Sequence, residues 1–187
     1  MAKRQASTNI IAGDLKGTKI YFKPNKALRP TESKTKETLF NWLLNDLDQK
    51  TCLDMFSGTG ALGLEAISRG AKKVVFIERQ KRLCQNLEEV LKKLKIEDKC
   101  RIINTNATSF DFRILKEKFD LIFLDPPYKL KNLDIILKNL MVNKVLNKNG
   151  IIILHRHKNQ KDIFPNNFNI IEEKIYGISK VLFIILN

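Results

Sequence analysis

Short apolar runs of strand length alternate with segments of helical period along most of this chain, and this alternation limits the possible folds more than any other feature. The predicted elements, in chain order, are strand 51–56, helix 60–70, strand 73–78, helix 80–95, strand 100–105, a short helix or turn over 109–118, strand 119–125, helix 130–146 and strand 150–156. Repeated strand–helix units pack as a mostly parallel sheet with helices on both faces. The chain is therefore predicted to have an α/β, Rossmann-like fold.

The two ends of the chain depart from this alternation. Residues 169–186 contain two β-rich runs around "YGIS", which predicts an antiparallel hairpin that completes a sheet of seven strands. Ahead of the first strand come a basic, β-like segment over 8–22, a loop through Pro24 and Pro30, and a helix over 31–47. We divide the chain into a basic N-terminal hairpin extension, 1–30, and a single globular domain, 31–187.

The charge balance indicates an anionic partner. Lysine and arginine number 34 against 20 acidic residues, and the formal net charge is +14 at pH 7. The excess is densest in residues 1–30, where Asp14 is the sole acidic residue. This pattern predicts a nucleic-acid surface that includes Lys16, Lys19 and Lys23. The alternative is that a lysine- and asparagine-rich composition is a general property of this protein's surface.

Other features indicate a cytoplasmic protein without a metal centre. The apolar runs fall far short of the ~20 residues needed to cross a bilayer, and no signal-peptide segment is present. The three cysteines are widely spaced and odd in number, as expected for reduced thiols. His155 and His157 could share one strand face, but no third ligand accompanies them, and we interpret them as strand-end or RNA-facing residues.

The segment "LDMFSGTGALGLEA" places Gly58, Gly60 and Gly63 in a G-x-G-x-x-G spacing between a strand and a helix. Such a turn lets a nucleotide approach the backbone, although a tight turn without a ligand or a NAD-type site has the same pattern. Asp54 would repel a pyrophosphate but could hold an ammonium group such as that of S-adenosylmethionine. Glu78 is placed to bind ribose hydroxyls, unless it is only a solvated strand end.

Residues 106 and 107 follow the third predicted parallel strand, where an adenine ring would be bound. Asn106 could equally be an ordinary turn former, and it is followed by Ala107.

The segment "FDLIFLDPPYK" ends a buried strand with Asp125, Pro126, Pro127 and Tyr128. This strand is predicted to neighbour the first parallel strand, so that Asp125 faces the same crevice as the glycine turn. The prolines lack N–H groups, and the corner offers acceptors suited to an amine. Acceptors on an exocyclic amine favour a pyramidal nitrogen that can attack a methyl sulfonium, and Tyr128 could stack the base. A rigid turn without a ligand is the alternative.

With "IIAGDLKGTKI", "LRPTESKTKETLFNWL", "CLDMFSGTGALGLEAISRGA" and "INTNATSF", these motifs resemble the bacterial small-subunit ribosomal RNA methyltransferase D family of class I, S-adenosylmethionine-dependent enzymes. The resemblance covers nearly the whole chain. It implies methyl transfer to N2 of a guanine in 16S ribosomal RNA within an assembling small subunit, with a catalytic corner from Asp125 to Tyr128. We expect the protein to be a monomer. It also implies RNA contacts from the N-terminal hairpin, from the Arg29-Pro30-Thr31 loop and from Lys34. The implied cofactor-binding residues are Asp54, Phe56, Gly58, Thr59, Gly60, Gly63, Glu78, Arg79, Asn106 and Ala107.

The chain departs from the family pattern at a few positions. Lysine stands at 34 and 36, where arginine is common, and His155 stands where many members carry glutamate.

Two other functions remain open from the residues. An enzyme resembling DNA adenine methyltransferases is the first alternative, although this chain has no room for a separate target-recognition domain. A guanine edge, with N1–H beside N2–H, suits one carboxylate better than adenine or cytosine does. The second alternative is a noncatalytic RNA-binding assembly factor, which would have no need of the glycines or of "DPPY".

Overall fold

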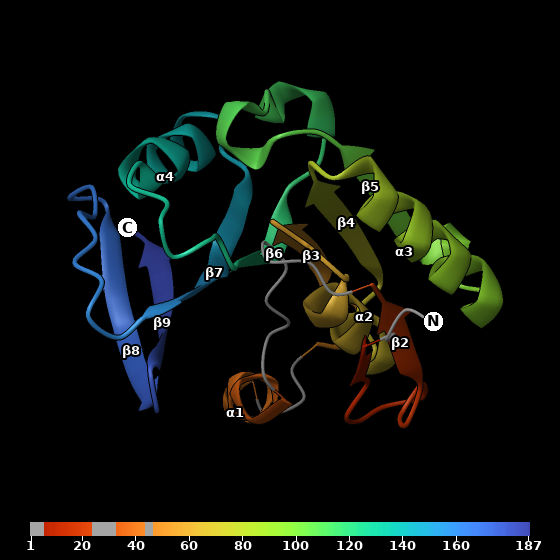
Figure 1. Ribbon diagram of the computed structural model, residues 1–187. Helices are drawn as coiled ribbons and strands as arrows, with labels where there is room; N and C mark the ends of the chain where they lie inside the picture. Colours follow the sequence, from red (N-terminus) through yellow and green to blue (C-terminus); the bar gives the residue numbers. More distant parts are fainter. Residues whose placement is uncertain (1–5, 24–32, 44–46) are drawn as a thin grey trace.

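The computed structural model describes residues 6–23, 33–43 and 47–187 (Figure 1). The predicted RNA contacts Arg29, Pro30 and Thr31 lie outside these ranges, and so does the side chain of Lys34.

A seven-stranded sheet forms the centre of the molecule, with the strand order β5-β4-β3-β6-β7-β9-β8. Neighbours from β5 to β7 pair in parallel, whereas β7–β9 and β8–β9 are antiparallel. The predicted sheet, with its C-terminal antiparallel hairpin, is therefore confirmed. The strands are β3 (Thr51–Met55), β4 (Lys73–Glu78), β5 (Cys100–Asn104), β6 (Phe119–Leu124), β7 (Leu146–His157), β8 (Phe168–Tyr176) and β9 (Ser179–Leu186).

Helices cover both faces of this sheet (Figure 1). They are α1 (Ser33–Trp42), α2 (Ala61–Ser68), α3 (Lys81–Leu94) and α4 (Leu133–Val142), with 3₁₀ turns η1 (Glu97–Lys99), η2 (Ala107–Ser109) and η3 (Phe112–Leu115). The predicted helix over 130–146 is too long at its C-terminal end. Lys144 takes a left-handed backbone conformation (φ 51°), and Leu146 already pairs with Phe119 as the first residue of β7.

The strand alternation divides the core into two layers. Cys52, Phe123 and Ile153 pack with α1, α2 and α3 on one face, and Leu53, Ile122 and Ile152 pack with η3 and α4 on the other. In the segment predicted as a helix over 31–47, α1 ends at Trp42, and the apolar side chains of Leu39, Phe40, Leu43 and Leu47 are buried, while Leu44 lies outside the described residues.

The N-terminal segment forms an antiparallel hairpin of β1 (Ala6–Asn9) and β2 (Lys19–Phe22), which lies beside α2 and α3 (Figure 1). The connection between β1 and β2 is anchored to the core. The buried Glu65 carboxylate accepts hydrogen bonds from Ile11 N (2.7 Å) and Ala12 N (3.0 Å). The buried Lys36 Nζ donates to Thr8 Oγ1 (3.1 Å) and to the backbone oxygen of residue 9 (2.6 Å). Burial lowers the pKa of Lys36, and the charge of Glu65 opposes that change.

Candidate active site

The glycine turn and the acidic corner lie at the same edge of the sheet. Strands β3 and β6 are parallel neighbours, and Met55 pairs with Leu124 as their last partners. The turn that begins at Phe56 and the corner that begins at Asp125 therefore leave the sheet side by side. Asp54, Glu78 and Asp125 also continue the alternation that faces α1 and α2, so their carboxyl groups converge on one side of the sheet.

The glycine turn adopts a tight path between β3 and α2. Gly58 (φ 56°) and Gly60 (φ 76°) have left-handed backbone conformations, which glycine adopts without steric cost. Gly63 serves a different purpose, because a Cβ there would lie 2.3 Å from the Phe76 ring. Its role in the structure is close packing of α2 against β4. Thr59 is buried within the turn, and Phe56 is partly buried at its start.

Asp54 is the most perturbed carboxyl group of the site. Its side chain is buried, and Oδ2 accepts a hydrogen bond from Gly63 N at 3.0 Å. The pKa of Asp54 is raised to about 8, chiefly by burial and also by the charges of Asp125 and Glu78, while the Gly63 hydrogen bond opposes the rise. A nearby cation would favour the ionised form of this group.

Glu78 closes the other side of the turn. Its Oε2 accepts from Gly58 N (2.9 Å) and its Oε1 from Gln80 N (2.7 Å), so it holds the turn and the start of α3 together. Arg79 is exposed beside it. Past β5, Asn106 Oδ1 accepts from Thr108 N (3.1 Å) as the cap of η2, which is the turn-forming role noted from the sequence.

His155 is a site residue that the sequence interpretation missed. It lies near the end of β7, as the strand-end interpretation has it, but it is only 7% exposed and its Nδ1 lies 2.8 Å from Asp125 Oδ1, a contact that the sequence does not indicate. The register between β6 and β7 explains this contact. Leu124 pairs with Leu154, so the next residues, Asp125 and His155, lie side by side. A carboxylate at Asp125 accepts from Nδ1–H, and a neutral imidazole with its proton on Nδ1 carries its lone pair on Nε2.

Tyr128 is held by aromatic neighbours. Its ring meets His155 edge-on (centroids 6.1 Å apart) and His157 likewise (5.4 Å), and its hydroxyl lies 3.2 Å from Ser179 Oγ. The two histidine rings therefore share one strand face, as their spacing predicted, and they fix the orientation of a flat side chain next to Asp125.

The predicted RNA-binding lysines of the hairpin are exposed. Lys16 lies in the β1–β2 connection, and β2 alternates buried Ile20 and Phe22 with outward-facing residues. Lys19 and Lys23 consequently lie on the same side as the half-exposed Tyr21.

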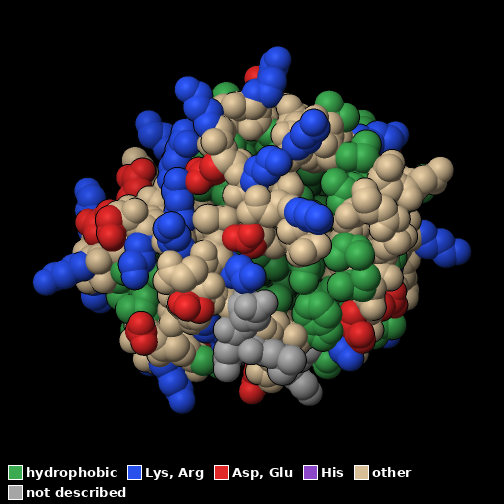
Figure 2. Space-filling view, turned by 180° about the vertical axis from the view of Figure 1, so that it is seen from behind, with side chains coloured by type: hydrophobic (Ala, Val, Ile, Leu, Met, Phe, Trp, Pro, Cys, Tyr) green, Lys and Arg blue, Asp and Glu red, His purple; other side chains and the backbone are tan. Residues whose placement is uncertain are grey.

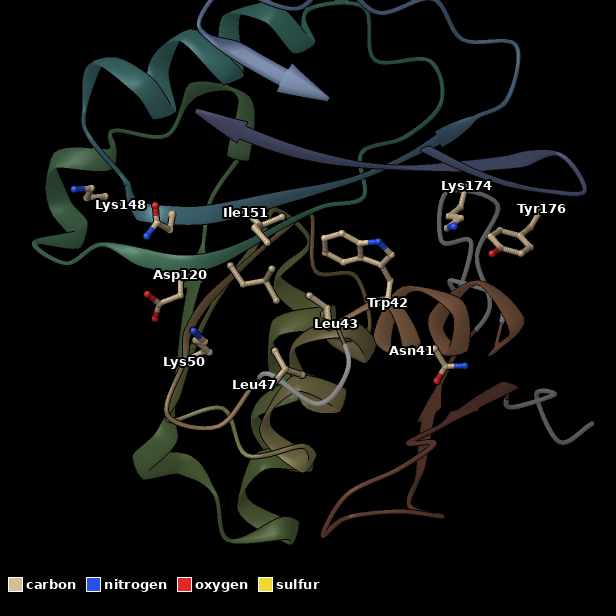
Figure 3. Close-up of a pocket in the computed structure, with 12 residues that line it drawn as sticks. Asn41, Trp42, Leu43, Leu47, Lys50, Asp120, Lys148, Ile151, Lys174 and Tyr176 are labelled. Carbon is tan, nitrogen blue, oxygen red and sulfur yellow. The ribbon is translucent and has the colours of Figure 1, made fainter. Parts of the chain in front are cut away.

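A separate cavity of about 980 Å³ lies between α1 and strands β6, β7 and β8 (Figure 3). Trp42 occupies its middle and stacks on Phe183, with ring centroids 3.8 Å apart. The cavity extends to Lys50 and Asp120 at the amino ends of β3 and β6, which is the opposite end of the sheet from the glycine turn. None of the predicted catalytic or cofactor residues is among its described lining, and we place the candidate active site at the acidic corner instead.

Within the described residues there is no group of histidine, cysteine and carboxylate side chains that could hold a metal ion. The same part of the chain contains no helix long and apolar enough to span a membrane.

A sheet of this order, with a glycine turn after β3 and an Asp-Pro-Pro-Tyr corner after the adjacent β6, defines a class I methyltransferase. A solved structure described as a putative methyltransferase from Escherichia coli superposes with a TM-score of 0.83 at 31% identity, over 96% of this chain and 97% of that one.

The chain belongs to the family described as "Conserved hypothetical protein 95", whose model matches residues 8–185. A relative from Haemophilus influenzae, named ribosomal RNA small subunit methyltransferase D, is 37% identical over 180 residues, which cover 93% of this chain and 91% of the relative. The protein of that name from Escherichia coli K12 is 36% identical over 172 residues, covering 90% and 84%. The family resemblance noted from the motifs is confirmed.

Proposed function

We propose that this protein transfers the methyl group of S-adenosylmethionine to the exocyclic N2 of a guanine in 16S ribosomal RNA. The observation that carries the proposal is the adjacency of β3 and β6, which opens the glycine turn and the Asp125 corner at one edge of the sheet. The relatives named ribosomal RNA small subunit methyltransferase D support RNA as the substrate class.

The residues beside the glycine turn fit a cationic nucleoside cofactor. The carboxyl groups of Glu78 and Asp125 lie close enough to Asp54 to raise its pKa, and this concentration of negative charge disfavours a pyrophosphate and favours ammonium and sulfonium groups. S-adenosylmethionine supplies, when bound, a methyl group activated by its sulfonium. We assign the ammonium to Asp54, the ribose hydroxyls to Glu78 and the adenine to Asn106 and Ala107, with Phe56, Gly58, Thr59, Gly60, Gly63 and Arg79 completing the pocket.

The corner after β6 is the proposed receptor for the amine. Asp125 accepts an N–H of the exocyclic amine, and the Pro126 carbonyl accepts its other proton, which favours a pyramidal nitrogen with an available lone pair. A carboxylate offers roughly four lone-pair sites, so Asp125 can accept from His155 and from a base at the same time. Guanine is favoured because N1–H and N2–H lie side by side on its edge.

Tyr128 is the proposed stacking platform for an extruded base. Its contacts with His155, His157 and Ser179 hold the ring before the substrate arrives. Stacking of a base on an aromatic ring contributes about 1–3 kcal/mol.

The substrate-binding surface is proposed to include the N-terminal hairpin with Lys16, Lys19 and Lys23, together with Arg29, Pro30, Thr31 and Lys34. We propose that the enzyme acts as a cytoplasmic monomer on 16S ribosomal RNA within an assembling small subunit.

Product analysis tests the reaction. The purified protein is incubated with S-[methyl-³H]adenosylmethionine and either deproteinised 16S RNA or partly assembled small subunits, and the labelled RNA is digested to nucleosides. We expect N2-methylguanosine, with the ratio between the two substrates indicating whether protein is part of what is recognised. Label that appears only in DNA, as N6-methyladenine, would refute guanine as the target. Absence of transfer to any nucleic acid would favour the noncatalytic assembly factor.

A further inference from the structure

Arg156 is fully buried directly behind the catalytic corner. Its guanidinium donates to the Pro127 carbonyl from Nη1 (3.2 Å) and to the Leu130 carbonyl from Nη2 (2.9 Å). The same group forms a two-point ion pair with Asp162, from Nε to Oδ2 (3.0 Å) and from Nη2 to Oδ1 (2.8 Å). A planar guanidinium can satisfy all of these acceptors at once, which an ammonium cannot.

Arg156 and His155 approach the corner from opposite faces of the sheet. Ile151, Ile153 and His155 follow the face that carries α1, while Ile152, Leu154 and Arg156 follow the face that carries α4. His155 thus contacts the Asp125 side chain, and Arg156 holds the backbone that follows it. The corner is fixed at both its carboxyl group and its carbonyls.

The hydrogen bonds of Arg156 also determine which backbone carbonyl groups of the turn are already paired within the protein. The Pro127 oxygen accepts from both Arg156 Nη1 and Leu130 N (2.9 Å), so its hydrogen-bonding capacity is used within the protein. The acceptors that we assign to the amine at this turn are Asp125 and the Pro126 carbonyl. A shift of the turn would change the direction of both.

We infer that Arg156, paired with Asp162, is a positioning residue for methyl transfer, which sets the placement of Asp125 and Tyr128 through the backbone of residues 127–130. This inference rests on the proposed function, because it deepens the account of the same site. A buried ion pair is in itself weak evidence of a contribution to stability, since well-packed apolar replacements are often as stable. If Arg156 positions the turn, its replacement should lower the methyl-transfer rate even in a variant that is as stable as the wild type.

The test compares single-turnover methyl-transfer rates at saturating cofactor and nucleic acid. Arg156→Lys retains the positive charge but loses the planar guanidinium that bonds several acceptors at once. We expect the rate to fall about a hundredfold, as for a reacting group displaced by roughly 1 Å. Cofactor affinity, measured by calorimetry, should remain close to that of the wild type. The double variant Arg156→Met/Asp162→Leu replaces the ion pair by apolar groups of similar volume. It should fold with a melting temperature near that of the wild type and still be slow.

The matched control is Arg69→Lys, which alters another buried arginine–carboxylate pair, between Glu65 of α2 and Arg69 at its C-terminal cap (2.8 Å). We expect it to lower the melting temperature but to leave the rate at saturation unchanged. A double variant that folds and transfers methyl at the wild-type rate would overturn the inference, as would a rate loss in Arg156→Lys matched by Arg69→Lys. All rates are referred to whichever nucleic acid the wild type labels. A wild type that methylates DNA would therefore refute the proposed function while the ratio for Arg156 remained measurable.

Discussion

At the scale of single residues, Asp125 lies after β6, between the strand that leads to the glycine turn and the strand that carries His155. Its carboxyl group contacts His155 of β7, whereas the glycine turn that we assign to the cofactor follows β3, the neighbour of β6 on the other side. We expect Asp125→Ala to lower the methyl-transfer rate by about a hundredfold or more, because electrostatic contacts to a reacting group contribute on that scale. Cofactor affinity, measured by isothermal titration calorimetry, should persist. Asp111→Ala, which removes an exposed carboxylate paired with Arg113, is the control. Loss of cofactor binding in Asp125→Ala would contradict the role assigned to Asp125.

Asp54 makes the stability of the protein depend on pH in a particular direction. Its pKa is raised from an ordinary 3.8 to about 8, so the native state retains a proton that the unfolded chain releases between these values. The free energy of unfolding should therefore decrease as the pH rises from about 4 to 8, with a slope of at most about 1.4 kcal/mol per pH unit from this one proton. Asp54→Asn should flatten this dependence.

The measurement for Asp54 is urea denaturation of wild type and Asp54→Asn at several pH values between 5 and 8. The difference between the two proteins isolates this residue from the other titrating groups. Parallel pH profiles would show that the folded state holds Asp54 ionised throughout.

At the scale of secondary-structure elements, the alternation of apolar runs predicted every parallel strand. It failed at the end of α4, because "LDIILKNLMVNKVL" remains apolar at helical spacing past Val142, and no glycine or proline marks the stop. The helix ends at Val142, Lys144 then takes a left-handed backbone conformation, and the chain joins β7 against Phe119. Local pattern contains no information on that pairing, since it depends on the distant strand β6.

The hairpin element carries a prediction about salt. Replacing Lys16, Lys19 and Lys23 by glutamate should weaken RNA binding and reduce the slope of log K against log salt, because each phosphate contact contributes about 0.9 to that slope on duplexes and about 0.7 on single strands. Filter binding over a range of potassium chloride concentrations measures both quantities. The control replaces Lys118, Lys144 and Lys148, exposed residues near the amino ends of β6 and β7, and changes the net charge by the same amount. Equal slopes in the two triple variants would assign the hairpin lysines to general surface charge.

At the scale of the whole molecule, the positive excess is not confined to the hairpin. Lys and Arg side chains project from much of the face seen in Figure 2, with acidic side chains between them. A net charge of +14 attracts RNA from every direction, and specific contacts must be separated from this attraction by matched variants.

The motifs predicted the site's main carboxylates because strand order follows from the fold class, and strand order places Asp54 and Asp125 at one edge. His155 and Arg156 could not be assigned in the same way. Their partners depend on the register between β6 and β7 and on a loop that brings Asp162 back to the strand, which are properties of the assembled chain.

The anchoring of the hairpin by Glu65 and Lys36 has a consequence for how such an enzyme can change over generations. Deleting the first residues would remove the backbone N–H groups that bond Glu65 and the oxygen atoms that bond Lys36, and a loss of hydrogen bonds to buried charged groups is costly for a marginally stable domain. With the RNA-binding role proposed for the hairpin, a new target specificity would therefore arise by replacing its outward-facing side chains one at a time, because the same segment is also a part of the scaffold that keeps the protein folded.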